Sequence, residues 1–227
     1  MATLMLRLAA PLQAWGVDSK FEIRKTNREP TKSGVIGLLA AALGARRDDE
    51  EILQKLNTLR FGVRIDQEGR LLIDLHTARK DEKTSYLTRR HYLADAIFVV
   101  GLESEDRAFL QELKEALSHP AFPLYLGRRS CPPTQPVCLG IREEGLIEAL
   151  KNEAWQGKKR RLQEAKTLRV MIDAVPGDKG AAPQRDLAIS FNPTHRQYGY
   201  RAVREKILEP EKNFGGETEH DPFLELR

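Results

Sequence analysis

Hydrophobic residues in the first half of the chain repeat first with the spacing of a strand and then with that of a helix, and this alternation indicates the fold. Within 3–9, Leu4, Leu6 and Leu8 alternate with smaller or polar residues, which predicts an opening strand. An apolar helix is predicted over 35–43, and Gly44 ends it. The later predicted elements are strands over 60–65, 71–75 and 93–102, a helix over 104–118 and a strand-like segment over 122–126.

The order strand, helix, two strands, helix, strand predicts an α+β sheet with its helices on one face. This is the ferredoxin-like (RRM-like) pattern, which many RNA-binding modules share. Beyond it, the sequence predicts a helix over 144–154 and a closing hairpin made from 168–175 and 198–208.

The segment 76–92 breaks the pattern, because seven His, Lys and Arg residues crowd it and it has no apolar face. It lies between two predicted strands, and a polar stretch in that position is usually functional or mobile. Its cations could grip a sugar-phosphate backbone while Tyr86, His91 or Tyr92 stacks on bases. The alternative interpretation is a solvated loop.

Composition excludes several classes of protein. The 227 residues are 41% hydrophobic and 31% charged, and no apolar run approaches the roughly 20 residues of a spanning helix. We therefore expect a soluble, cytoplasmic protein with no membrane partner. Cys131 and Cys138 are too few for a disulfide scaffold and have no nearby His, so neither a metal nor a cofactor is expected.

The charge is divided unevenly along the chain. The net charge is +4, yet the segment from Glu205 onward has seven acids against three bases, which leaves +8 on residues 1–204. A basic body with an acidic tail is typical of proteins that bind polyanions.

Two short segments have the chemistry of a phosphate site. The predicted helix entrance at 31–34 combines unpaired N–H groups with Lys32 and the nearby Arg28. It lacks the glycine that a nucleotide-binding P-loop needs, and an ordinary N-cap at Thr31 or Ser33 is the alternative. The second segment is the basic turn at 127–133.

Three motifs, and a looser fourth, resemble the CasD family, the RAMP-type subunits of the type I-E CRISPR surveillance complex called Cascade. They are LRLAAPLQAWG at 6–16, PTKSGVIGLL at 30–39, YLGRRSCP at 125–132 and, more loosely, RHYLADA at 90–96. The resemblance implies a ferredoxin-like domain over 1–145 with an inserted thumb at about 76–92, and a β-rich extension over 146–227 on the same domain.

The resemblance also implies a function. Such subunits cap and hold the 5′ handle of CRISPR RNA, join the large subunit to the backbone subunits, occur as a single copy, and do not cut RNA. The residues expected to contact RNA are Gln13, Trp15, Arg24, Lys25, Arg28, Lys32, Ser33, Gly34, His76, Arg79, Lys83, Arg89, Arg90, Arg128 and Arg129.

Two rival interpretations stay open at this point. A metal-independent endoribonuclease that processes repeat RNA would draw its base, acid and cation from His91, Tyr86 and Lys83. A purely bridging subunit would instead set the basic face against an acidic protein partner.

Overall fold

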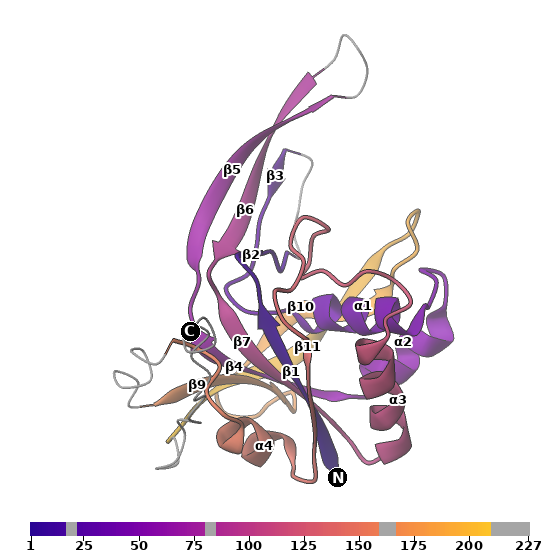
Figure 1. Ribbon diagram of the computed structural model, residues 1–227, viewed down its shortest axis with the longest axis vertical. Helices are drawn as coiled ribbons and strands as arrows, with labels where there is room; N and C mark the ends of the chain where they lie inside the picture. The colour runs from indigo at the N-terminus through magenta and orange to yellow at the C-terminus, as the bar shows by residue number, and fades with distance from the viewer. Residues whose placement is uncertain (17–21, 80–84, 159–166, 210–227) are drawn as a thin grey trace, which may run out of the picture.

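A computed structural model describes residues 1–16, 22–79, 85–158 and 167–209. Seven strands of this described part form one antiparallel sheet in the order β10-β11-β9-β4-β7-β1-β8 (Figure 1). They are β1 (Ala2–Ala9), β4 (Arg60–Gln67), β7 (Ile97–Ser104), β8 (Cys138–Arg142), β9 (Leu168–Ala174), β10 (Ala181–Ser190) and β11 (Gln197–Leu208).

Helices cover both faces of this sheet. Leu4, Leu6 and Leu8 lie in the larger apolar cluster, where α1 (Lys32–Leu43), α2 (Glu50–Asn57) and α3 (Arg107–Ser118) pack. Met5 points to the other face, into a smaller cluster formed with α4 (Leu146–Asn152). The expectation of helices on one face is therefore wrong, because β1 is apolar at the intervening position as well and needs cover on both sides.

A second sheet holds β2 (Leu12–Gln13), β3 (Ile23–Arg24), β5 (Arg70–Arg79) and β6 (Ser85–Ala94), with β6 pairing to all three others. Figure 1 shows the β5–β6 hairpin projecting from the body. The break in pattern at 76–92 thus marks mostly regular strands, which were not predicted. Most of β5 is exposed, so no buried face imposes an alternation on its sequence.

The C-terminal strands extend the main sheet. β9 and β11 pair as predicted, with Asp173 opposite Val203, and β9 also pairs with β4. The stretch between them contains a further strand, β10, on the outer side of β11. The segment 122–126 is not a strand, because the N–H groups of Ala121 and Phe122 bond to the last turn of α1 instead.

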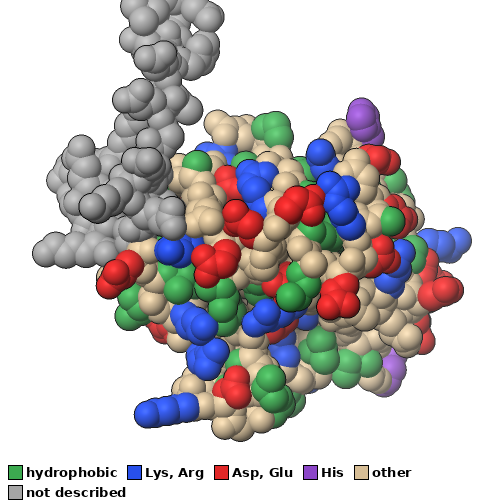
Figure 2. Space-filling view, turned by 90° about the horizontal axis from the view of Figure 1, so that it is seen from below, with side chains coloured by type: hydrophobic (Ala, Val, Ile, Leu, Met, Phe, Trp, Pro, Cys, Tyr) green, Lys and Arg blue, Asp and Glu red, His purple; other side chains and the backbone are tan. Residues whose placement is uncertain are grey.

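No helix in the described residues is long and apolar enough to cross a membrane. On the end of the molecule seen in Figure 2, acidic and basic side chains are interspersed over the described surface.

Candidate nucleic-acid interface

The bend that follows β1, at residues 10–16, is held by hydrogen bonds of the buried Gln13 side chain. Gln13 is fully buried, and its Nε2 donates to the carbonyls of Leu8 at 3.1 Å and Ala96 at 2.8 Å. Its Oε1 accepts from Trp15 Nε1 at 3.1 Å. Gln13 was expected to contact RNA, but its polar atoms are used inside the fold, so it holds the bend in shape.

Trp15 links this bend to the basic segment that follows. Its backbone N–H donates to Thr26 Oγ1 at 2.8 Å, and its carbonyl accepts from Asn27 N–H at 2.9 Å. The indole is 1% exposed. A Cβ at position 34 would lie 2.9 Å from the Trp15 ring, so Gly34 lets the first turn of α1 pack directly on the indole.

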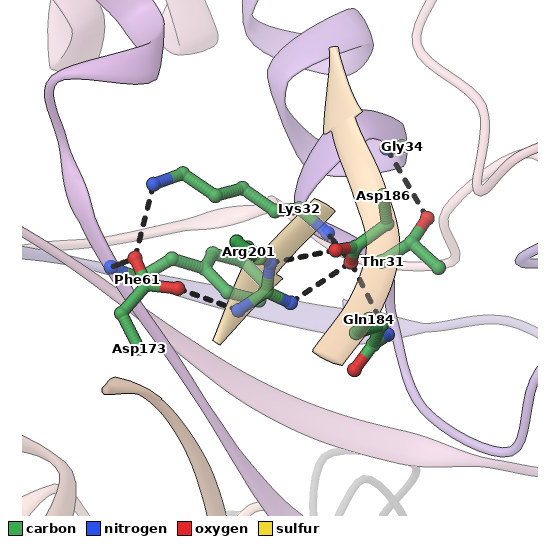
Figure 3. A network of polar contacts seen from close by, with 8 residues as sticks. All are labelled: Thr31, Lys32, Gly34, Phe61, Asp173, Gln184, Asp186 and Arg201. Carbon is green, nitrogen blue, oxygen red and sulfur yellow. Dashed lines mark hydrogen bonds and ion pairs between the residues drawn. The ribbon is translucent and has the colours of Figure 1, made fainter. Parts of the chain in front are cut away.

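The start of α1 is capped by protein groups. Thr31 Oγ1 accepts from Gly34 N–H at 3.3 Å, and the N–H of Lys32 donates to Asp186 Oδ2 at 2.8 Å. The ammonium of Lys32 is buried and pairs with Asp173 at 3.0 Å (Figure 3). Lys32 therefore faces the interior and is not the expected phosphate ligand, because Asp173 pairs with its ammonium and Asp186 accepts from its backbone N–H.

Arg201 of β11 completes this network. Its Nε donates to Asp186 Oδ1 at 2.6 Å and its Nη1 to Asp173 Oδ1 at 2.5 Å (Figure 3). Burial alone would lower the pKa of Arg201, but the two carboxylates raise it above its ordinary value, so the guanidinium stays charged. The network fixes β9, β10 and β11 to the first residue of α1.

The basic turn meets the bend at very short range. Gly127 has a φ of 85°, and a Cβ there would lie 1.6 Å from the carbonyl oxygen of Ala14. Ala14 N–H donates to the Leu126 carbonyl at 3.1 Å, and Cys131 N–H closes the turn on the Arg128 carbonyl at 2.9 Å. Only glycine fits this position, and its presence sets where Arg128 lies.

Arg128 connects three elements. Its Nη2 donates to the carbonyl of Arg24 in β3 at 2.9 Å, and its guanidinium lies 4.5 Å from the ring centre of Tyr92 in β6. Burial would raise the pKa of the Tyr92 phenol, but hydrogen bonds from Ser130 and Arg128 lower it overall. The turn, β3 and β6 thus form one wall.

These elements enclose a cleft of about 470 Å³. Its lining residues are Ala14, Trp15, Gly16, Arg24, Lys25, Thr31, Ser33, Gly34, Gly127, Arg128, Arg196 and Tyr198. Four are cations and none is acidic, and among the described residues no ion pair neutralises Arg24, Lys25, Arg128 or Arg196. A concave site lined by one sign of charge concentrates the potential and attracts anions.

The cleft brings together six of the predicted residues and adds two that sequence reasoning missed. Trp15, Arg24, Lys25, Ser33, Gly34 and Arg128 line it as a group. Arg28 and Arg129 are exposed outside it. Arg196 comes from the turn between β10 and β11 and Tyr198 from the first residues of β11, and no local motif distinguishes this Arg-Gln-Tyr from an ordinary strand start.

The β5–β6 hairpin divides its predicted contacts between two faces. Its unbroken register puts Arg79, Arg89 and His91 on one face, and His76 and Arg90 on the other with Tyr92. Tyr92 carries Arg128 over its ring, so the face with His76 and Arg90 is turned toward the basic turn. Lys83 lies outside the described residues.

The same register bears on the nuclease interpretation. Tyr86 pairs with Ala78 and His91 with Ile73, so the two side chains leave opposite faces of the hairpin. General acid–base cleavage needs both groups within hydrogen-bond reach of one phosphate. The described residues therefore do not assemble this pair. They also hold no group of three or more metal-ligating side chains.

Comparison with known proteins agrees with this fold. Residues 3–204 match the family model described as CRISPR-associated protein (Cas_Cas5), and the chain belongs to this family. It is 42% identical over 156 residues to the CRISPR system Cascade subunit CasD of Escherichia coli (strain K12), a match that covers 60% of this chain and 70% of the relative. The resemblance seen in the sequence is confirmed.

Two solved structures share the fold over nearly the whole chain. One, described as "Crystal structure of Cas protein", is 40% identical with a TM-score of 0.74 and covers 94% of this chain and 98% of its own. The other, described as "CRISPR RNA-guided surveillance complex", is 28% identical with a TM-score of 0.78 and covers 99% of this chain and 97% of its own. These matches place the chain among mixed α+β Cas proteins.

Proposed function

We propose that this chain is the RNA-binding subunit of a Cascade-type CRISPR surveillance complex, where it caps and holds the 5′ handle of CRISPR RNA without cutting it. The observation that carries the proposal is the cleft with four unneutralised cations, in a chain similar to a Cascade subunit and to a chain of an RNA-guided surveillance complex. The partners are CRISPR RNA and the large and backbone subunits, and the chain is present once per complex.

We infer a ferredoxin-like core from the order of elements β1-α1-β4-β7-α3-β8. Four of these strands lie side by side in the order β4-β7-β1-β8, which is the arrangement of a split βαβ fold. The β5–β6 hairpin is inserted between β4 and β7 of this core, and we assign it as the thumb.

The chemistry of the cleft suits single-stranded RNA. Arg24, Lys25 and Arg128 supply charge-assisted hydrogen bonds to phosphate oxygens. Such contacts fix the position of the strand and carry no sequence information by themselves, so reading of the target is left to pairing by the guide. Gln13, Trp15 and Gly34 hold the floor of the cleft in place.

The outer face of the hairpin supports the bridging role. Ile73, Leu75 and Leu87 share this face and are 55%, 62% and 56% exposed. Charged side chains on the same face, Arg79 and Arg89, are basic. Apolar side chains exposed together on a protruding hairpin are typical of a protein-binding surface, and we assign this face to a neighbouring subunit.

Salt dependence of RNA binding tests the assignment. Each phosphate contact to single-stranded RNA contributes about 0.7 to the slope of log K against log salt. Lys25→Gln and Arg128→Gln should each weaken binding of a handle-containing RNA and reduce this slope by about that amount. Arg129→Gln, next to Arg128 but outside the cleft, is the matched control. The RNA should stay intact on a denaturing gel with EDTA present.

Two results would overturn the proposal. One is a slope that neither cleft variant changes, or that Arg129→Gln changes as much. The other is a new cleavage product, which would make the chain a nuclease. Thermal unfolding of each variant shows whether weaker RNA binding comes from a lost phosphate contact or from displacement of the basic turn. Lys25→Gln is the clearer of the two variants, because the Lys25 side chain is exposed.

A further inference from the structure

The turn between β10 and β11 and the first residues of β11 line the cleft, although they lie more than 160 residues from the first motif. Arg196 and Tyr198 line the cleft together with residues from the first 34 positions and the basic turn. Neither residue belongs to a motif that identified the family. Their position in the cleft therefore indicates a ligand contact in addition to those expected from the N-terminal motifs.

This turn is held in a defined shape. Asn192 Oδ1 accepts from the N–H of Thr194 at 3.0 Å and from its hydroxyl at 2.8 Å, and His195 N–H bonds to the Asn192 carbonyl at 3.1 Å. Phe191 packs against the main core and meets the Tyr198 ring edge-on, with ring centres 6.5 Å apart. The Tyr198 ring is thus oriented by its own hairpin.

The base of the turn is fixed to the helices that face it. Asn57 Nδ2 of α2 donates to the Ala188 carbonyl at 2.6 Å. Asp186 of β10 accepts from both the Lys32 N–H and Arg201, so the two strands are tied to the first residue of α1 (Figure 3). Since α1 begins at the cleft, the wall and the floor are held by the same buried network.

We propose that the β10–β11 turn is a nucleotide clamp, in which Tyr198 stacks on one base of single-stranded RNA and Arg196 binds the adjoining phosphate. This deepens the proposed function and rests on it. The cleft volume of about 470 Å³ falls in the range of sites that hold one small ligand, roughly 300–1,000 Å³. A groove of cations with an aromatic platform is the usual means of holding an unpaired nucleotide.

The lining favours RNA over an acidic protein segment. Tyr198 is half-buried, its ring contacts Phe191 edge-on, and the residue lines the cleft beside the cations. A base gains binding energy by stacking its π-face on an aromatic ring, whereas an acidic peptide would contact only the cations. The clamp therefore predicts that one RNA base stacks on Tyr198 when the RNA binds, and that this stacking contributes to the affinity for RNA.

A fluorescent base tests the stacking step. The full-length chain is titrated into single-stranded handle RNA that carries 2-aminopurine at each position in turn, and wild type should quench the probe strongly at one position. Tyr198→Ala should abolish that quenching and weaken binding on the order of tenfold, while Tyr198→Phe keeps both. Tyr200→Ala is the matched control, since Tyr200 is on the same strand, 68% exposed and outside the cleft.

The phosphate step is tested by charge. Arg196→Gln should lower the salt slope by about 0.7, whereas Arg46→Gln, an exposed arginine just after the far end of α1, should leave it unchanged. Melting temperatures of all variants show whether the protein stays folded. Quenching that Tyr198→Phe keeps and Tyr198→Ala loses shows that the aromatic ring itself is needed, whatever the effect of the alanine on stability.

The outcomes separate the clamp from the proposed function. Loss of binding in Lys25→Gln and Arg128→Gln with wild-type behaviour of Tyr198→Ala and Arg196→Gln would overturn the clamp and leave RNA binding in place. A wild-type chain with no affinity for the RNA would overturn both. Quenching that Tyr200→Ala removes as fully as Tyr198→Ala would also reject the clamp.

Discussion

Replacing Gly127 by alanine should disturb the site, because among the described glycines this is the position where an added Cβ would make the shortest contact. The new Cβ would lie 1.6 Å from the Ala14 carbonyl oxygen, and because ordinary contacts are about 3.5 Å, the two segments would have to separate by about 2 Å. That separation breaks the bond from Ala14 N–H to the Leu126 carbonyl, which is worth roughly 1 kcal/mol.

Backbone strain adds to the collision. Gly127 has a φ of 85°, and this region costs a residue with a Cβ roughly 1–2 kcal/mol. Gly177 isolates that second contribution, because its φ is 96° and a Cβ there would meet nothing within 4 Å. We expect a loss of about 1–2 kcal/mol for Gly177→Ala and about 2–3 kcal/mol for Gly127→Ala.

Urea unfolding of the two variants measures the difference, and RNA titration shows its effect on the site. Displacement of the turn moves Arg128 off Arg24 and Tyr92, so Gly127→Ala should also lose RNA affinity, while Gly177→Ala should not. Equal destabilisation by the two substitutions would refute the close approach of Ala14 to Gly127, and with it the explanation of how Arg128 is placed.

Three further outcomes are expected. Lys32→Met should cost about 2 kcal/mol by urea unfolding, because it leaves Asp173 partly unpaired, and it should leave the salt slope of RNA binding unchanged; a reduced slope would return Lys32 to the phosphate ligands. Tyr92 has a lowered pKa when folded, so its phenolate favours the native state. The stability of wild type relative to Tyr92→Phe should be fully gained above about pH 10 and be lost as the pH falls through the lowered pKa. A difference that does not change with pH would contradict the hydrogen bonds to the phenol. Ile73→Asp should change the free energy of unfolding by less than about 0.5 kcal/mol yet prevent co-purification with the partner subunits. Ile207→Asp, at a residue that is also exposed but lies on β11, should not prevent it.

The core elements were predictable because each has a buried face on which apolar side chains repeat. The helices over 35–43 and 104–118 and the opening strand are all present within a few residues of their predicted bounds. The hairpin was missed for the opposite reason. β5 is exposed along most of its length, so its sequence carries no two-residue repeat to identify it.

Side-chain roles were harder to predict than elements. The family resemblance marked Gln13, and residue type marked Lys32, as polar groups free to bind RNA. Whether such a group is free depends on partners distant in sequence, such as Ala96 and Asp173. Tyr198 was missed for the same reason, since only the sheet order brings it to a cleft that begins at Ala14.

The sheet order also has a consequence for synthesis on the ribosome. β1, β4 and β7 are complete by residue 104, yet the acceptors of Lys32 lie on β9 and β10, and the arginine that orders them lies on β11. A nascent chain that has formed the first strands still lacks one wall of its cleft, because these contacts span more than 140 residues and close late. The proposed RNA cleft is therefore complete only when the last strand has paired, and we expect a truncated chain to lack it.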